Sequence, residues 1–154
     1  MRICVDTTIL LDILKDEYRA YQDMLYMAIA EGEDLVAPSV VYGELIPQFQ
    51  GDIKSLQQFL KEHRIDVYPL DMESVAMAAN AWMKYLKRRI RVRCPQCGYE
   101  IEKKEHLLSD FYIGGFALAR CDTILTRDRG IYRKYFPQLN GYQGCLSKGP
   151  FSSV

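Results

Sequence analysis

The sequence predicts a three-layer α/β fold, in which a mostly parallel central sheet of four or five strands lies between two layers of helices. Short apolar runs of strand length alternate along the chain with longer segments whose apolar residues recur every three or four positions. Strands joined by helices pair in parallel, and a parallel sheet needs helices on both faces. With 154 residues, 49% of them hydrophobic, the chain can bury one good core, so we expect a single domain over residues 1–150.

The strands are expected at short apolar runs that end in polar or turn-forming residues. Four such runs cover residues 2–5, 35–37, 67–70 and 123–125. A fifth run at residues 142–146 follows the turn signal Asn140-Gly141 and would add an edge strand.

The helices are expected where apolar residues repeat at helical spacing. The clearest repeat follows the capping residue Asp71 and consists of Val75, Ala78, Ala79, Trp82 and Leu86. One further helix begins after Ser39 and is kinked or ended by Pro47. The others are predicted over residues 7–14, 18–30, 53–63, 110–120 and 130–136.

The composition limits the classes of function. Lysine plus arginine and aspartate plus glutamate each total 20, so any affinity for nucleic acid must come from a local patch rather than from net charge. The sequence has neither a secretory leader pattern nor a run of about 18 apolar residues, so we expect a soluble cytoplasmic protein without a membrane segment. The five cysteines, with Cys4 and Cys121 in apolar surroundings, argue against a disulfide framework.

Four acidic residues stand where a strand ends or a helix begins: Asp6, Glu44, Asp110 and Asp128. Open α/β folds bind ligands at the carboxyl edge of the sheet, so these positions indicate one shared pocket whose oxygens suit Mg²⁺ or Mn²⁺. Each aspartate also has an ordinary explanation as a helix cap, a first-turn acid or a loop residue. Glu44 borders the apolar stripe of its helix, which is an unusual place for a surface glutamate.

The order and surroundings of these acids resemble the motifs of the PIN domain family of metal-dependent ribonucleases, which includes the toxins of VapBC-type toxin–antitoxin pairs. The matching segments are residues 5–10, residues 38–45, Ser109-Asp110 with Ile113 and Ala117, and residues 125–130. By the same resemblance, Thr7 and Thr126 orient a carboxylate or touch phosphate, although capping and turn formation explain these threonines equally well.

The resemblance implies a metal-dependent endoribonuclease that hydrolyses RNA phosphodiester bonds at a Mg²⁺ or Mn²⁺ site. Asp6 and Asp110 would be the most direct ligands, while Glu44 and Asp128 would bind a second metal or hold metal-bound water. The enzyme would act either as a toxin held by an antitoxin protein or as a free-standing RNA-processing nuclease. The alternative function is a catalytically inactive PIN-like module for RNA binding or assembly, against which the intact acidic set argues.

A basic run at the end of the helix that follows Asp71 concentrates positive charge in an otherwise neutral chain. Its members are Lys84, Lys87, Arg88, Arg89, Arg91 and Arg93. We expect the last five of them to contact the RNA backbone. Cations at a helix C-terminus also complement the helix dipole, which is the simpler explanation.

The segment Cys94-Pro95-Gln96-Cys97-Gly98 departs from the usual PIN pattern, and we interpret it as part of an insertion at about residues 91–104. This spacing is typical of a zinc knuckle, but two thiolates supply only half of a tetrahedral Zn²⁺ site. His106, another cysteine, or the same thiolates from a second copy would complete the site, and we favour the symmetric homodimer. A metal-free loop and a redox pair are the alternatives; the hairpin-like residues 98–101 disfavour the redox pair, which needs a following helix.

Gly114 and Gly115 fall inside the helix predicted over residues 110–120, where each costs about 1 kcal/mol relative to alanine. Close packing against another backbone is the favoured explanation. Access for a nucleic-acid strand is the functional alternative.

Overall fold

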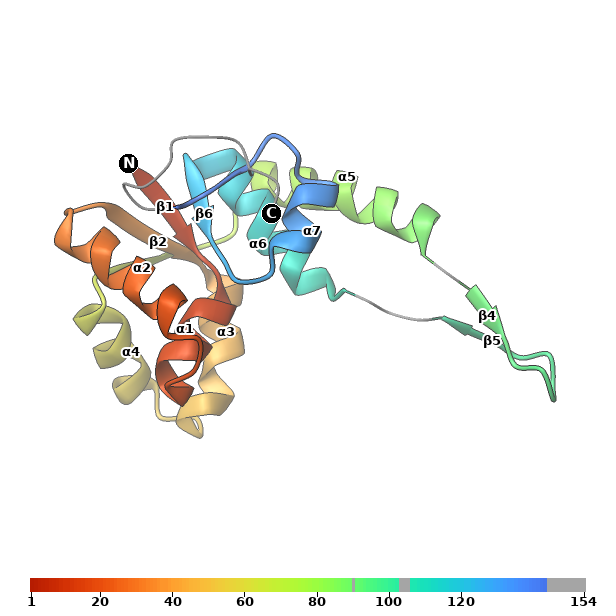
Figure 1. Ribbon diagram of the computed structural model, residues 1–154, viewed down its shortest axis with the longest axis horizontal. Helices are drawn as coiled ribbons and strands as arrows, with labels where there is room; N and C mark the ends of the chain where they lie inside the picture. The colour runs from red at the N-terminus through yellow and green to blue at the C-terminus, as the bar shows by residue number, and fades with distance from the viewer. Residues whose placement is uncertain (90, 103–105, 144–154) are drawn as a thin grey trace.

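A sheet with the strand order β3-β2-β1-β6-β7 forms the centre of the protein (Figure 1). The structure is a computed structural model that describes residues 1–89, 91–102 and 106–143. The strands of this sheet are β1 (Arg2–Val5), β2 (Asp34–Pro38), β3 (Ile65–Tyr68), β6 (Thr123–Leu125) and β7 (Asn140–Gly141). Each pairs in parallel with its neighbours, which confirms the predicted sheet type.

Helices cover both faces of the sheet (Figure 1). The chain passes from β1 to β3 through α1 (Thr7–Lys15), α2 (Arg19–Ala30), α3 (Ser39–Leu45), the 3₁₀ turn η1 (Ile46–Phe49) and α4 (Ile53–Glu62). The later helices are α5 (Met72–Arg88), α6 (Leu108–Arg120) and α7 (Arg129–Tyr135). Because parallel crossovers are right-handed, the return from β3 to β6 places α5 and α6 on the opposite face from the earlier helices. Within the described residues, no helix has the length and apolar character needed to cross a membrane.

The strand order reverses between β1 and β6, and this reversal determines where a ligand can bind. The chain leaves β1 towards β2 and β3 and later returns to the other side of β1 as β6. Val5 pairs with Leu125, and the backbone N–H of Asp6 donates to the Leu125 carbonyl at 3.0 Å, so the segments after both strands leave the sheet side by side. Crevices at such reversals are the usual ligand sites of open α/β sheets.

Two strand predictions differ from the structure. The third strand covers Ile65–Tyr68 rather than residues 67–70, because this edge strand carries the exposed Asp66, which interrupts the apolar pattern. The edge strand predicted at residues 142–146 begins earlier than expected. Asn140–Gly141, which were predicted to form a turn, are themselves the strand that pairs with β6. Residues 144–146 lie outside the described residues.

A hairpin lies outside the central sheet and extends away from the body of the protein (Figure 1). Its strands β4 (Arg91–Arg93) and β5 (Glu100–Glu102) pair antiparallel. The hairpin expected around the two cysteines is thereby confirmed.

The two glycines of α6 allow this helix to pack very close to its neighbours. A Cβ on Gly115 would overlap the Ser74 carbonyl oxygen and lie 2.7 Å from the Ala78 backbone nitrogen, both on α5. A Cβ on Gly114 would overlap the ring of Phe136. Packing, rather than access for a nucleic acid, therefore accounts for both glycines.

Gly115→Ala is expected to lower the free energy of unfolding by about 1–3 kcal/mol, because overlap with a backbone outweighs the gain of about 1 kcal/mol in helix propensity. Gly43→Ala in α3 is the matched control, since its Cβ would meet no atom within 4 Å. That variant should gain up to about 1 kcal/mol. Urea unfolding measures both, and a Gly115→Ala protein as stable as wild type would contradict the packing explanation.

Candidate active site

Asp6 lies at the strand-order reversal, directly after β1, and is only 3% exposed. Its Oδ2 accepts hydrogen bonds from the hydroxyl groups of Thr126 at 2.6 Å and Thr8 at 3.0 Å. Although Asp6 occupies the N-cap position of α1, its side chain accepts no capping hydrogen bond. Helix capping therefore does not explain this acid, and its carboxylate is held by hydroxyl groups from two separate segments.

Glu44 is brought to the same region by α3, which begins directly after β2. The hydroxyl of Thr7 donates a hydrogen bond to Glu44 Oε2 and so ties the start of α1 to α3. Thr7 is buried and Glu44 is half-buried. The hydroxyl groups of Thr7 and Thr126 therefore each donate a hydrogen bond to the side chain of one of the four acids, Glu44 and Asp6 respectively.

Asp110 and Asp128 approach from α6 and from the start of α7. Asp110 is half-buried, and its Oδ2 accepts the backbone N–H of Leu107 at 3.0 Å, so this acid also caps its own helix. Asp128 is exposed at the N-cap position of α7, where its side chain accepts no capping hydrogen bond. Its backbone N–H donates to the Thr126 hydroxyl at 3.0 Å, so Thr126 contacts both Asp6 and Asp128.

The acids share one region of negative potential. Burial raises the pKa of Asp6 to about 6, and the negative charges of Asp110 and Glu44 add to this effect, while the two threonine hydrogen bonds oppose it. Burial is also the main cause of the raised pKa of Asp110, to which the charges of Glu44 and Asp128 contribute. Burial raises the pKa of the Tyr132 phenol as well, and three of the four acids add to that shift.

The donor set fits a hard divalent cation in type and in charge. All four side chains offer oxygen ligands of the kind that Mg²⁺ and Mn²⁺ prefer. A cation would offset the negative charges of Asp110 and Glu44, which add to the effect of burial on the pKa of Asp6. Within the described residues, however, no three His, Cys, Asp or Glu side chains are grouped closely enough to hold a metal ion. The four acids therefore have the right chemistry for such an ion without forming a closed ligand shell.

The raised pKa of Asp6 should make the metal-free protein less stable at pH 7 than near pH 4. The pKa of Asp6 is about 6 in the folded state against 3.8 for a free aspartate side chain, so between these values the folded state keeps a proton that the unfolded state loses. The stabilisation is complete below pH 3.8 and is lost as the pH rises through 6, a difference of about 3 kcal/mol.

Urea unfolding in EDTA, compared between wild type and Asp6→Asn, isolates this contribution from other titrating groups. Asp6→Asn should be the more stable of the two at pH 7 and should lose that advantage near pH 4. A stability difference that does not change with pH would contradict the raised pKa of Asp6.

A partly buried ion pair between Asp12 and Arg127 supports the site, and the sequence did not indicate it. Asp12 is not among the four acids singled out in the sequence, yet its side chain is 1% exposed. Its Oδ2 accepts a hydrogen bond from Arg127 Nε at 3.0 Å. The Arg127 guanidinium carbon lies 4.0 Å from the centroid of the Tyr18 ring. The backbone N–H of Arg127 donates to the Thr8 hydroxyl at 3.3 Å. The loop that carries Thr126 is therefore anchored to α1.

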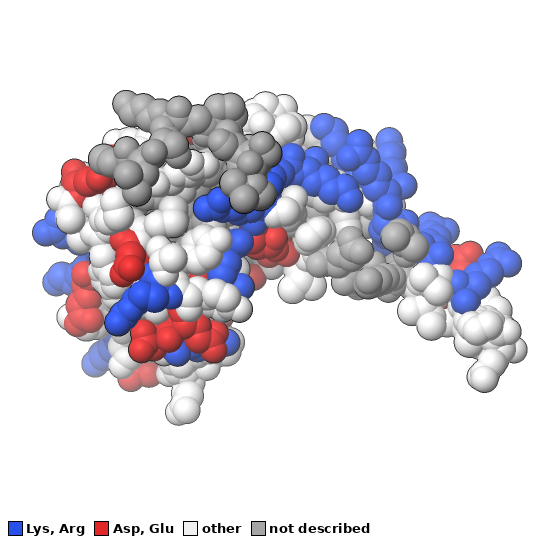
Figure 2. Space-filling model, in the orientation of Figure 1, with Lys and Arg blue, Asp and Glu red and all other residues white. Residues whose placement is uncertain are grey.

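The basic run lies on the last turns of α5 and on β4, where Lys and Arg side chains gather on one side of the protein (Figure 2). Its exposed members on α5 are Lys84, Lys87 and Arg88, and Arg89 is half-buried. Arg91 and Arg93 each lie 3.6 Å from a carboxylate oxygen of Glu100 across the hairpin. The single negative charge of Glu100 offsets only one of the two guanidinium charges beside it, so the hairpin keeps a net positive charge at these three residues.

Cys94 and Cys97 are free cysteines that flank the turn of the hairpin. The backbone N–H groups of Cys97 and Gln96 hydrogen-bond to the Cys94 sulfur and hold the pKa of its thiol below the ordinary value. His106 packs its ring against that of Tyr85, with centroids 5.6 Å apart, and makes no metal-binding group with the cysteines. Of the three ways to complete a zinc site, the described residues therefore do not support the one through His106. Cys145 lies outside the described residues.

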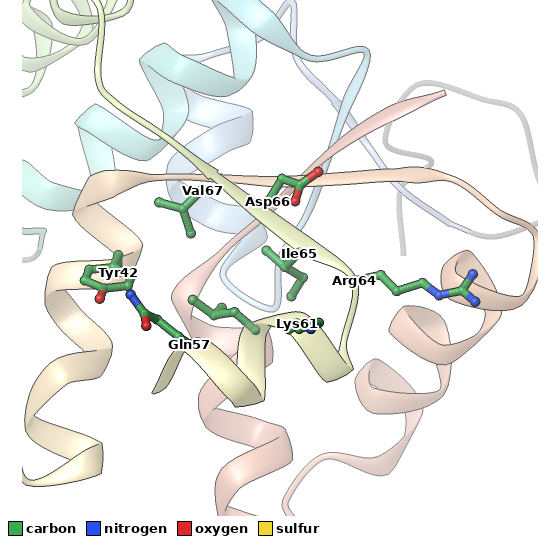
Figure 3. A pocket seen from close by; sticks show the side chains of 8 residues that line it. Tyr42, Gln57, Lys61, Arg64, Ile65, Asp66 and Val67 are labelled. Atoms are coloured by element: carbon green, nitrogen blue, oxygen red, sulfur yellow. The ribbon is translucent and has the colours of Figure 1, made fainter. Parts of the chain in front are cut away.

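A separate pocket of about 400 Å³ lies between α3, α4 and the edge strand β3 (Figure 3). Its lining includes Tyr42, Lys61 and Arg64, and none of the four acids contributes to it. This pocket is therefore not part of the candidate active site.

The sequence and the fold were compared with protein families and solved structures. The PIN domain model matches residues 3–137. The crystal structure of VapBC2 from Rickettsia felis, bound to a DNA fragment from their promoter, superposes with a TM-score of 0.63 at 16% identity, covering 90% of this chain and 96% of that one. The structure of VapBC-1 from nontypeable Haemophilus influenzae gives a TM-score of 0.67 at 15% identity, covering 94% and 98%. No curated protein matches the chain significantly. At these identities the two structures show likeness of fold alone.

Proposed function

Because the chain belongs to the PIN domain family, we propose that it is a metal-dependent endoribonuclease whose active site is built from the four acids described above. The observation that carries this proposal is the position of Asp6, a buried carboxylate at the strand-order reversal whose pKa is raised to about 6. A buried charge of this kind costs stability, and such costs are concentrated at functional sites.

In the proposed site, Asp6 and Asp110 hold Mg²⁺ or Mn²⁺ most directly, while Glu44 and Asp128 complete the ligand set or orient water. When bound, the ion supplies polarisation of a phosphate oxygen and lowers the pKa of water. Thr126 keeps the Asp6 carboxylate oriented through the hydrogen bond at 2.6 Å.

Incubation of purified protein with single-stranded RNA and Mn²⁺, with EDTA in a parallel sample, tests this function. The proposal predicts cleavage within the RNA that requires the ion and stops with EDTA. Cleavage at the same rate in EDTA would contradict metal dependence.

The second candidate is an inactive PIN-like module that binds RNA or assembles through its hairpin. The observation that favours it is that the acids form no closed metal-binding group within the described residues. Tight RNA binding without cleavage in any divalent metal would support this candidate over the nuclease.

The basic run is proposed to bind the RNA backbone. Replacing Lys87 and Arg88 together by glutamine, in the Asp6→Asn background to prevent cleavage, should weaken binding of single-stranded RNA. Two lost phosphate contacts should reduce the slope of log K against log salt by about 1.4, or about 0.7 for each contact. Fluorescence anisotropy across about 50–200 mM salt measures this slope.

The control for this experiment removes the same charge elsewhere. Lys54 and Lys61 are exposed on α4, which lies apart from the end of α5 in Figure 1. Glutamine at both positions should leave the slope within error of the parent. Equal slopes for the α5 variant and the α4 variant would remove the basic run from the RNA site.

We also propose an antitoxin protein as a partner, since both similar structures are described as VapBC assemblies. Expression of the chain alone should then arrest growth, and co-expression of a small neighbouring gene should relieve the arrest. Growth unaffected by the active enzyme, with no such neighbouring gene, would favour the RNA-processing role.

A further inference from the structure

One face of the β4–β5 hairpin is apolar and exposed. The register pairs Val92 with Ile101, and the Cys94 N–H continues the ladder by donating to the Tyr99 carbonyl at 2.8 Å. Cross-strand partners share a face and side chains alternate along a strand, so these four residues lie on the same face. Val92, Tyr99 and Ile101 are 50%, 73% and 54% exposed.

The opposite face of the hairpin carries the charged side chains of Arg91, Arg93 and Glu100, which form exposed ion pairs. The hairpin also extends away from the body of the protein (Figure 1). A two-stranded hairpin is marginally stable in water unless its apolar face packs against something else. Packing of a second surface against the apolar face would therefore stabilise the hairpin.

The turn of the hairpin supplies half of a tetrahedral metal site. The Gly98 N–H donates to the Cys94 carbonyl at 2.9 Å, and the φ of 71° at Gly98 permits the tight turn that places Cys97 beside Cys94. Backbone N–H groups point at the Cys94 sulfur, as suits a thiolate ligand. No third ligand joins the pair within the described residues. A tetrahedral metal site at this turn would need two further donors from elsewhere.

We propose that two copies of this chain pair through the apolar faces of their hairpins and bind one Zn²⁺ with Cys94 and Cys97 of each copy. With a two-fold axis through the ion, the two thiolates of each copy together supply the four ligands that a structural zinc requires. The same axis brings the identical apolar faces of the two hairpins together. The charged faces stay in water. Each thiol that ligates zinc releases its proton to solvent, so no oxidant or reductant takes part. This inference does not depend on nuclease activity.

Zinc content and molar mass of the purified, reduced wild-type protein test the proposal. One zinc per two chains and a mass near twice the 17.9 kDa of the chain are expected. Cys94→Ser and Cys97→Ser should each lose the zinc and the dimer together. Cys145→Ser is the matched control and should keep both. In the cobalt-substituted protein, the visible spectrum should be that of a tetrahedral site with four thiolates.

A second variant separates the apolar contact from metal ligation. Val92→Thr combined with Ile101→Thr keeps strand-forming residues and both thiols, so dimers should form only at higher protein concentration and should still hold one zinc per two chains. Three results would overturn the proposal: one zinc in each monomer that is lost in Cys145→Ser, zinc content unchanged in Cys94→Ser, or a dimer that persists without zinc in both cysteine variants.

Discussion

Asp6→Asn is expected to slow RNA cleavage by about 1,000-fold, equivalent to about 4 kcal/mol of transition-state stabilisation. An amide has nearly the shape of the carboxylate but carries no charge, so it is a poor ligand for a hard divalent cation. Asp6 is the most buried of the four acids, and it accepts hydrogen bonds from both Thr126 and Thr8. The same substitution should raise stability at pH 7 in EDTA, so lost activity would not reflect unfolding.

Asp122→Asn is the matched control for this substitution. Asp122 is an exposed acid that directly precedes β6. Its Oδ2 accepts a hydrogen bond from the Arg2 backbone N–H at 2.7 Å. Cleavage by Asp122→Asn should stay within a few-fold of wild type under the same Mn²⁺ concentration. Equal rates for wild type and both variants would remove Asp6 from the active site and indicate a contaminating nuclease.

Arg127→Met is expected to lower the free energy of unfolding by about 3 kcal/mol, the lower end of the cost of breaking a buried ion pair, because Asp12 is buried but Arg127 is 34% exposed. The Asp12 carboxylate is 1% exposed and would lose the hydrogen bond from Arg127. Asp12→Asn should cost less, because the side chain of Arg127 is 34% exposed and still packs over Tyr18. Cleavage should fall in Arg127→Met even where the protein is folded, because the loop that carries Thr126 loses its anchor.

A double-mutant cycle distinguishes the ion pair from general packing. Asp12→Asn combined with Arg127→Met should be more stable than the sum of the single effects allows, since no buried charge is left without a partner. Arg129→Met is the control, because the guanidinium of Arg129 lies 6.0 Å from the Tyr21 ring and its loss should cost less than about 1 kcal/mol. Strictly additive effects in urea unfolding would show that Asp12 and Arg127 do not interact.

The elements that sequence reasoning identified well are those with strong periodic patterns. The repeat from Val75 to Leu86 lies within α5, and the apolar runs before Asp6 and before Thr126 are the central strands β1 and β6. Errors fell on edge strands. An edge strand pairs with a neighbour on one side only and tolerates polar residues. Asp66 interrupts the apolar pattern of β3, and the predicted strand therefore began two residues too late.

The four acidic residues of the candidate site could be predicted from the sequence, but the side chains that hold them in place could not. Acids at the ends of strands and the starts of helices follow from the pattern alone, whereas the Thr8 hydrogen bond to Asp6 depends on how the first turn of α1 faces the sheet. The burial of Asp12 could have been predicted, because Asp12 lies three residues after the buried Ile9 and therefore on the inner face of α1. A buried acid on such a face needs a partner, but the sequence does not show that Arg127, distant in the chain, supplies it.

Anomalous diffraction from crystals grown with Mn²⁺ would show whether the four acids form one divalent-metal site. We expect a manganese peak at coordination distance from carboxylate oxygens of Asp6 and Asp110, and its loss in crystals of Asp6→Asn. Well-ordered crystals with no peak beside these acids, or with manganese bound only elsewhere, would contradict a divalent-metal site at these acids.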